Sequence, residues 1–411
     1  MSSAKFKPVE EQLAYLKKGV AEIIREEELK AKLTESVKTG KPLRVYLGVD
    51  PTAPDIHLGH TVVLRKLKQF QDMGHTAIFL IGDFSAMIGD PTGQSETRPP
   101  LKAEQAQKNA ETYLQQVFKI LDKSKTEVRY NNEWLGKLSS TEVVQLCAHY
   151  RLARMLERED FRLRLDANLP ISVHELLYPL LTAYDAVALK SDVELGATEQ
   201  KFNLLVHREI QREYGLPGQV ILTMPILVGL DGARKMSKSL GNYIGITEKP
   251  GEIFGKLMSI SDELMWPYYD LLTDVPSAEV RALRAQVTSG GRHPMDVKME
   301  LARRIVTDFH GAEAGEKAAS EFKRIYSKRE LPSEMQVHAF DEKGNPKLSY
   351  IIGYVNLAGS RSEAERLIKQ HAVEWDGHAV TDPAHAVDMT AKGDHILRVG
   401  KKPPVIVRIG G

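Results

Sequence analysis

The sequence has 411 residues, which is too long for one typical domain, so we expect two or three. Its single cysteine, Cys147, excludes a disulfide framework and a cysteine-rich zinc site, and we expect no protein-bound structural metal. The formal net charge of +1 does not indicate a nucleic-acid partner, so any RNA contact must come from local patches. A signal peptide and an apolar run long enough for a bilayer are both missing from the sequence, which favours the cytoplasm.

The first part of the chain predicts an α/β domain. The first forty residues favour one or two charged amphipathic helices that pack on this domain. Residues 44–49 are apolar and β-branched, which predicts a buried strand. A loop with two prolines and two aspartates follows, and the 3.6-residue spacing of apolar side chains predicts a helix over residues 61–73. Two histidines, His57 and His60, therefore flank a helix N-terminus.

His57, Gly59 and His60 have the chemistry of a phosphate cradle. Unpaired backbone N–H groups and the helix dipole favour an anion at a helix N-terminus. Two imidazoles would add hydrogen bonds, and a glycine lets a nucleotide approach closely. The alternative is that the histidines only satisfy the helix start, and an isolated His-x-x-His pattern would favour that alternative.

A second polar segment, residues 231–242, changes this balance. It has no hydrophobic period and glycines flank it, which predicts a mobile loop. Lys235 and Lys238 lie three residues apart beside serines, a pattern suited to a loop that closes on a pyrophosphate leaving group. Most short lysine and serine runs are solvated surface, but this one accompanies a histidine pair in a strand–helix unit.

The remaining chain predicts three further regions. Residues 102–164 favour a largely helical insertion that interrupts the alternation of strands and helices. Residues 331–346 are polar and contain proline and glycine, which predicts a linker. After it, the patterns predict helices over 348–357 and 363–370, a hairpin over 372–375 and 378–380 around Asp376-Gly377, and strands over 396–399 and 405–409.

Together, His57-Leu58-Gly59-His60 and Lys235-Met236-Ser237-Lys238-Ser239 resemble the paired signatures of class I aminoacyl-tRNA synthetases. Within that class, stretches 80–93, 155–161, 174–179 and 184–185 are similar to bacterial tyrosyl-tRNA synthetases. The resemblance extends over nearly the whole chain. It points to the branch that has a K-M-S-K-S loop and a C-terminal S-four-type RNA-binding domain.

The resemblance implies an α/β fold with three domains. A Rossmann-like parallel-sheet catalytic domain would occupy residues 1–230, with the helical insertion at about 102–164. The mobile loop and a helical anticodon-binding domain would occupy 231–330, and the RNA-binding domain 347–411. In the family the insertion makes the homodimer interface. Here the apolar side chains of Leu152, Met155, Leu156 and Phe161 could equally be internal core.

The activity that the resemblance implies is that of a tyrosine–tRNA ligase. The carboxylate of tyrosine attacks the α-phosphate of ATP, which gives tyrosyl-adenylate and pyrophosphate, and the tyrosyl group then passes to the 3′ end of tRNA(Tyr). ATP is a substrate that carries Mg²⁺ with it. Two alternatives remain open: a specialised paralogue that activates a modified aromatic amino acid, and an RNA-binding protein that has lost catalysis.

Individual residues acquire roles from the same resemblance. Tyr46 and Asp185 are expected to hold the phenol hydroxyl of tyrosine, and Asp90 and Tyr178 its ammonium group. Considered singly, Tyr46 would be an ordinary strand aromatic and Asp185 a surface carboxylate. The expected phosphate-binding residues are Thr52, His57, His60, Lys235 and Lys238. The other expected substrate or nucleotide contacts are Asp50, Gly59, Gly196, Gln200, Met236 and Ser237.

Three positions depart from the family pattern where the active site is expected. Thr182 stands where the family usually has Gln, and Ala197 and Glu199 stand where it has Gly and Asp. Threonine is shorter than glutamine, alanine adds a methyl group near the expected ribose, and glutamate is one methylene longer than aspartate. Our hypothesis is that Ala197 and Glu199 compensate each other, and that Thr182 weakens or reshapes recognition of the amino group.

Two groups of cations are candidates for RNA contact. Lys323 and Arg324 end an Ala-rich helical stretch, although a solvated basic helix end is an equal alternative. Residues 360–368 resemble the core of the S-four-type domain, with Ser360 or Ser362 as the N-cap. There the expected phosphate-binding cations are Arg361, Arg366 and Lys369.

Overall fold

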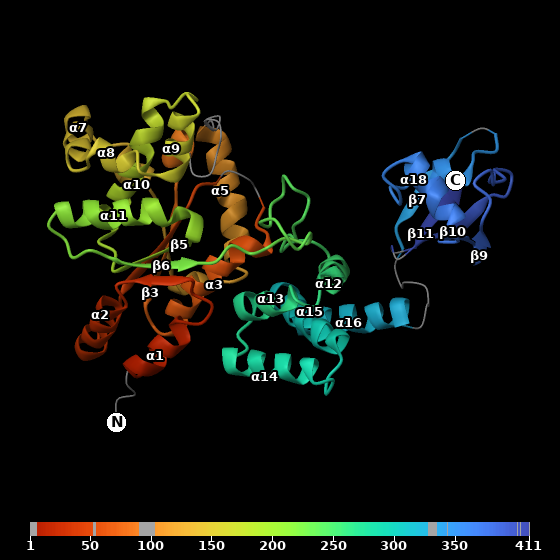
Figure 1. Cartoon of the computed structure of the whole chain (residues 1–411), viewed down its shortest axis with the longest axis horizontal. Helices are drawn as coiled ribbons and strands as arrows, with labels where there is room; N and C mark the ends of the chain where they lie inside the picture. The colour runs from red at the N-terminus through yellow and green to blue at the C-terminus, as the bar shows by residue number, and fades with distance from the viewer. Residues whose placement is uncertain are drawn as a thin grey trace. The chain divides into compact units, whose positions relative to one another are not determined.

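The computed structural model describes residues 6–51, 55–89, 103–327, 335–342, 344–400, 402 and 404–410, apart from the side chains of residues 103, 106, 326 and 327. The chain divides into two compact units, residues 1–318 and 319–411. Figure 1 shows the elements of both units. Among the described residues, no helix is long and apolar enough to cross a membrane.

The first unit contains a six-stranded sheet in the order β1-β6-β5-β2-β3-β4. Its strands are β1 (Glu22–Ile24), β2 (Arg44–Val49), β3 (Thr76–Ile81), β4 (Thr126–Tyr130), β5 (Val193–Ala197) and β6 (Val220–Met224). All neighbouring pairs are parallel except β1 and β6. The chain runs outward from β2 through β3 to β4 and then returns to β5 on the other side of β2. The carboxyl ends of β2 and β5 therefore form a topological switch point, where open α/β sheets bind ligands.

Helices surround this sheet on both faces. Those that precede or follow its strands are α1 (Val9–Leu16), α2 (Glu26–Thr39), α3 (Leu58–Asp72), α4 (Ser85–Ile88), α5 (Ala103–Val117), α10 (Val173–Leu189) and α11 (Lys201–Glu213). Helix α3 starts three residues before the predicted position, because His57 supplies an N-cap. One core cluster, beneath α10, joins Tyr46 of β2 to Ile78, Leu80, Ala186 and Leu189.

The predicted insertion contains a strand as well as helices. Its short helices are α6 (Asn132–Leu135), α7 (Ser140–Ala148), α8 (Leu152–Met155) and α9 (Glu159–Asp166), and a 3₁₀ turn covers Lys123–Lys125. Outside the insertion, a second 3₁₀ turn, Thr198–Gln200, precedes α11. Strand β4 pairs with β3 and extends the sheet. The prediction of a largely helical insertion did not include this strand, because an edge strand with charges at 127 and 129 lacks the apolar pattern of a buried strand. Met155 and Phe161 are buried core, whereas Leu152 is 60% exposed.

A helical region follows the sheet. It consists of α12 (Pro250–Ser259), α13 (Met265–Leu272), α14 (Ser277–Thr288), α15 (Pro294–His310) and α16 (Ala312–Ser327). Helix α13 packs against α3, so this region contacts the helix that His57 caps.

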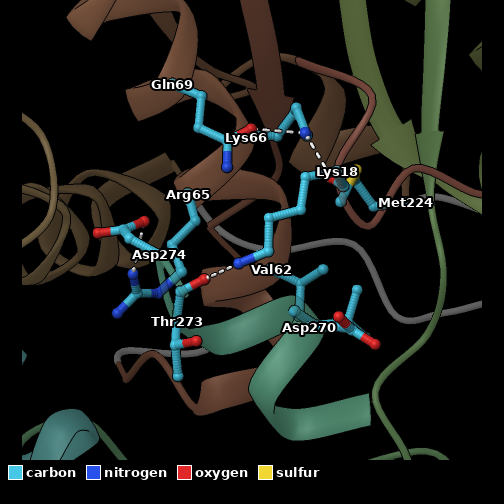
Figure 2. A pocket seen from close by; sticks show the side chains of 10 residues that line it. Lys18, Val62, Arg65, Lys66, Gln69, Met224, Asp270, Thr273 and Asp274 are labelled. Carbon is cyan, nitrogen blue, oxygen red and sulfur yellow. Dashed lines mark hydrogen bonds and ion pairs between the residues drawn. The ribbon is translucent and has the colours of Figure 1, made fainter. Parts of the chain in front are cut away.

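A small polar pocket, shown in Figure 2, lies where α3 packs against its neighbours, and hydrogen bonds around it connect these elements. The buried Lys66 ammonium of α3 donates to the carbonyls of Leu16 at 2.7 Å and Lys18 at 2.8 Å. Lys18 in turn donates to the carbonyl of Thr273 after α13. Burial lowers the pKa of Lys66 to about 7. These bonds tie α3 to the N-terminal helix and to the helical region.

The second unit has a five-stranded sheet in the order β7-β11-β10-β8-β9, with α17 and α18 packed on it. Its elements are β7 (Val337–Phe340), α17 (Leu348–Tyr354), α18 (Arg361–Lys369), β8 (Val373–Trp375), β9 (His378–Val380), β10 (Gly393–Val399) and β11 (Val405–Ile409). The predicted helices, hairpin and last two strands are all present. Strand β7, however, lies inside the segment predicted as a linker and pairs with β11.

Candidate active site

A cleft of about 520 Å³ opens at the carboxyl ends of β2 and β5, at the switch point of the sheet. The strand β2 contributes Tyr46 to its floor, and the start of α3 contributes His57 and His60. The opposite side comes from α10, α11 and the end of β5, and Lys235 and Lys238 lie at its edge. The two signatures, which are nearly 180 residues apart in sequence, therefore line one cavity.

Backbone pairing joins the histidine signature to the segment that follows the lysine signature. The Leu58 N–H donates to the Ile244 carbonyl at 2.9 Å, and the Ile246 N–H donates to the Ile56 carbonyl at 3.1 Å. A side chain at Gly59 would meet the His57 ring at 2.9 Å, so this position needs glycine even before a nucleotide is considered. Residues 231–242 form turns and one isolated bridge, from Lys235 to Val228, without a helix or strand, as expected for a loop.

The hydrogen bonds of the two histidines fix their tautomers. The Nδ1 of His57 accepts from the Gly59 N–H at 3.1 Å, and the Nδ1 of His60 accepts from the His57 N–H at 3.2 Å. Burial lowers the pKa of His57 to about 3 and that of His60 to about 4, so both rings are neutral at pH 7. A neutral ring that accepts at Nδ1 carries its proton on Nε2. The histidines therefore satisfy the helix start and also keep one N–H donor each.

Both lysines of the loop form ion pairs across the cleft. The Lys238 ammonium lies 2.8 Å from Asp55, and the Lys235 ammonium lies 3.0 Å from Glu199. The carboxylate of Asp231 accepts the backbone N–H groups of Ala233 and Arg234, which lowers the pKa of Asp231. These contacts give the loop its shape and bring two cations to the cavity.

The deep end of the cleft is buried and polar. Tyr46 is 1% exposed and Asp185 4% exposed. Asp185 accepts hydrogen bonds from Trp134 Nε1 at 2.7 Å and Asn131 Nδ2 at 3.3 Å, and burial raises its pKa to about 7. The Tyr46 hydroxyl makes no hydrogen bond within the described part of the chain. Such an orphaned buried hydroxyl suits a hydroxylated ligand.

Near this end, Asp50 holds Tyr178 in place. The Tyr178 hydroxyl donates to one oxygen of Asp50 at 2.8 Å, and the Ser85 hydroxyl donates to the other at 2.6 Å. A side chain at Gly82 would come within 2.1 Å of that carboxylate, so glycine leaves room for it. A carboxylate and a phenol hydroxyl together form a suitable site for an ammonium group.

Comparison with known proteins supports the same interpretation. The family model for class I tRNA synthetases (W and Y) matches residues 38–327. A tyrosine–tRNA ligase of Moorella thermoacetica is 54% identical over 394 residues, which cover 96% of this chain and 95% of the relative. One from Geobacter sulfurreducens is 52% identical over 96% of this chain and 98% of its own. The chain belongs to the tyrosine–tRNA ligase family.

Solved structures agree with this assignment. The tyrosyl-tRNA synthetase of Archaeoglobus fulgidus, in complex with L-tyrosine, has a TM-score of 0.60 and 26% identity, and the match covers 76% of this chain and all of that one. A truncated mitochondrial tyrosyl-tRNA synthetase of Coccidioides posadasii has a TM-score of 0.62 over 75% of this chain and 91% of its own, and at 22% identity it supports the fold alone.

The residues at the three positions that depart from the tyrosine–tRNA ligase pattern each make contacts within the protein. The Thr182 hydroxyl donates to the Tyr178 carbonyl at 2.8 Å and lies 3.0 Å from the Nε2 of His207. Glu199 pairs with Lys235, and the Ala197 N–H donates to the Gln200 side chain at 2.9 Å. A role for Thr182 in recognising the amino group stays a prediction.

Not every predicted site residue of this ligase family can be placed. Thr52 and Asp90 lie outside the described residues. A side chain at Gly196 would meet Leu204 at 2.8 Å, while Met236 and Ser237 line the cleft. Most candidate RNA-binding cations, namely Lys323, Arg361, Arg366 and Lys369, are exposed in the second unit, and Arg324 there pairs with Glu321. Ser360 is the N-cap of α18, since its hydroxyl accepts the Glu363 N–H at 3.2 Å.

The sequence alone did not single out four polar residues of the deep end: Asn131, Trp134, Glu194 and His207. A charge in the otherwise apolar strand Val193–Ala197 was a usable signal for Glu194, because buried charges need partners. His207 lies on the buried face of α11 with Val206 and Ile210, where polar residues are also unusual.

Proposed function

We propose that this cleft activates L-tyrosine with ATP and then transfers the tyrosyl group to tRNA(Tyr). The observation that carries the proposal is one cavity with a buried Tyr46–Asp185 end and a histidine–lysine end. In the first step the tyrosine carboxylate attacks the α-phosphate and pyrophosphate leaves. In the second, a terminal ribose hydroxyl of tRNA takes the acyl group. The direct test is tyrosine-dependent exchange between ATP and pyrophosphate.

At the phosphate end, catalysis is electrostatic. The Nε2–H groups of His57 and His60 and the hydroxyl of Thr52 would donate to phosphate oxygens. Lys235 and Lys238 would leave Glu199 and Asp55 to neutralise the departing pyrophosphate. Mg²⁺ would enter with ATP as part of that substrate. No covalent enzyme intermediate is needed, because the protein positions the two reactants.

The two substrates would lie end to end along the cleft. Tyr46 donates to the phenol oxygen and Asp185 accepts its proton in a hydrogen bond, while Tyr178 and Asp90 bind the ammonium group, with Thr182 and Gln200 nearby. The nucleoside would lie between the signatures, against the residues Asp50, Gly59, Gly196, Ala197, Glu199, Met236 and Ser237. This arrangement places the tyrosine carboxylate beside the α-phosphate.

Tyrosine binding is expected to weaken as the pH falls through about 7. Burial raises the pKa of Asp185 to about 7, so the ionised carboxylate predominates only above that pH. An ionised acceptor makes the stronger hydrogen bond to the phenol. Affinity is therefore full at alkaline pH and is lost on the acid side. Calorimetric titration at several pH values checks this, with phenylalanine as the control ligand, and a parallel loss for both amino acids would assign the effect to another group.

The tRNA would contact cations of the second unit of the chain. Lys323 and Arg324, together with Arg361, Arg366 and Lys369, offer cations to a phosphate backbone. Each such contact adds affinity that falls with salt concentration. We also propose a cytoplasmic location, where tRNA is found.

The same proposal includes a homodimer formed through the insertion. Four apolar side chains in or next to this region are more than half exposed: Val144 at 68%, Leu152 at 60% and Leu163 at 57% in the insertion, and Val173 at 73% at the start of α10. Exposed apolar groups gathered in one region are typical of a protein interface.

A charge within this surface should separate the subunits. In Leu163→Asp we expect sedimentation velocity to show a monomer where the unmodified protein is a dimer, because burying an unpaired carboxylate is costly. Met295→Asp, at a 36% exposed position of α15, is the matched control and should stay dimeric. A Leu163→Asp protein that remains a dimer would place the interface elsewhere.

A further inference from the structure

A closed set of hydrogen bonds lies beneath the tyrosine end of the cleft. The Nδ1 of His207 is 2.7 Å from one oxygen of Glu194, and the other oxygen of Glu194 accepts from the Gln219 amide. The Nε2 of His207 is 3.0 Å from the Thr182 hydroxyl. His207 is 7% exposed and Glu194 3% exposed, yet both contribute to the lining of the cavity.

The hydrogen-bond partners indicate which atoms of His207 carry protons. A carboxylate only accepts, so the Nδ1 of His207 must donate to Glu194. The Thr182 hydroxyl donates to the Tyr178 carbonyl at 2.8 Å, so the oxygen of Thr182 is left to accept from Nε2. We assign this ring, which then donates at both nitrogens, as an imidazolium. It also gives Glu194 a counter-ion, which a buried carboxylate needs.

Glu194 lies close to the residues expected to bind tyrosine, so its charge and that of His207 affect the tyrosine subsite. Strands β2 and β5 pair in parallel, and Tyr46 is directly opposite Glu194 in the register. Asp185 on α10 faces Glu194 and His207 from the neighbouring helix, and their charges act on it in opposite directions. Asn131 and Trp134, the other groups bonded to Asp185, are neutral, and Arg129 lies over the Trp134 ring. The carboxylates of Asp185 and Glu194 therefore lie together at the buried end of the cleft with one imidazolium.

We propose that His207 is a positioning residue for the tyrosine subsite: as an imidazolium it neutralises Glu194, so that Asp185 stays ionised to accept a hydrogen bond from the phenol. The inference rests on the proposed role of Asp185 in binding tyrosine. His207 itself needs no contact with the substrate, because its two nitrogens are engaged by Glu194 and Thr182. The Tyr46 hydroxyl, which makes no hydrogen bond within the described part of the chain, can donate to the ligand.

The test compares three variants by the pH dependence of kcat/KM for tyrosine in pyrophosphate exchange. The acid limb is the part of the profile where kcat/KM falls as the pH is lowered. In His207→Gln, loss of the cation should move this limb to a pH about one unit higher, so that kcat/KM measured at a pH below the limbs of both proteins falls about tenfold. Glu194→Gln should move the limb to lower pH. The double variant removes both charges, so its limb should return close to that of the unmodified protein. The KM for ATP should change less than about twofold in each.

Controls separate this inference from the proposed function and from misfolding. His149→Gln removes a histidine from a surface pair with Glu213, 3.6 Å apart, and should leave the profile unchanged. If the unmodified protein shows no tyrosine-dependent exchange, the proposed function fails before the variants are considered. If the unmodified protein does show exchange, two results would contradict the positioning role. One is a pH profile of His207→Gln that is not shifted, and the other is a double variant whose profile does not return toward that of the unmodified protein. If His207→Gln does not fold in a thermal unfolding scan, the opposite shift in Glu194→Gln still decides.

Discussion

Replacing Lys238 with alanine is expected to slow tyrosyl-adenylate formation by about two to three orders of magnitude, while the dissociation constant of tyrosine stays nearly unchanged. The Lys238 ammonium lies at the edge of the cleft, 2.8 Å from Asp55, and Tyr46 and Asp185 occupy its deep end. A cation that acts only when negative charge develops on the leaving group contributes to the transition state and not to the bound amino acid.

Single-turnover formation of tyrosyl-adenylate measures the first quantity, and equilibrium titration with tyrosine measures the second. Lys137→Ala, at a site outside the cleft lining, is the matched control and should resemble the unmodified protein in both. Equal losses in adenylate formation and in tyrosine affinity would show that Lys238 supports the structure of the site as a whole, which contradicts the role assigned to it.

The second large effect is expected at the phenol end. Asp185→Asn should lower kcat/KM for tyrosine by about ten- to a hundredfold, because a hydrogen bond to a charged acceptor is worth about 1.5–3 kcal/mol. The amide oxygen of asparagine can still accept from Trp134, but its NH2 group then faces the Asn131 amide, which donates to Asp185 at 3.3 Å, so part of the loss comes from this internal contact. Phenylalanine has no hydroxyl and should lose little, so discrimination between the two amino acids should shrink by the same factor.

Tyr46→Phe should cause a smaller loss of kcat/KM for tyrosine than Asp185→Asn. It removes one hydroxyl that has no hydrogen bond in the described protein, so nothing internal is left unpaired. The expected loss for tyrosine is about three- to tenfold, as for a neutral hydrogen bond. The measurement is kcat/KM for tyrosine and phenylalanine in pyrophosphate exchange. If both amino acids lose equally in Asp185→Asn, the carboxylate shapes the pocket and does not read the hydroxyl.

Local patterns predicted much of the fold. Residues 44–49 have the apolar, β-branched composition of a central strand and form β2 with the same bounds. The hairpin around Asp376-Gly377 was also predictable, because both residues adopt positive φ, at 48° and 79°, which few other residue pairs tolerate. Strands β1 and β3 to β7 were not predicted individually. Among them, β1, β4 and β7 are short edge strands, which carry little apolar periodicity and depend on a neighbour for their hydrogen bonds.

The site was predictable to a different degree at its two ends. The histidine and lysine signatures were visible because they are short and contiguous in sequence. The network beneath the tyrosine subsite was not, because Thr182, Glu194 and His207 come from three elements and only tertiary packing brings them together. A histidine in a helix has no sequence signal that separates a satisfied core residue from one that tunes a binding site.

The most direct test of the central claim is amino-acid-dependent exchange between ATP and pyrophosphate, with a panel of tyrosine, phenylalanine, tryptophan and several ring-substituted tyrosines. We predict strong exchange with tyrosine and little with phenylalanine or tryptophan, which would also show that Thr182, Ala197 and Glu199 are compatible with tyrosine activation. Preference for a ring-substituted tyrosine, or no exchange with any amino acid, would contradict the account.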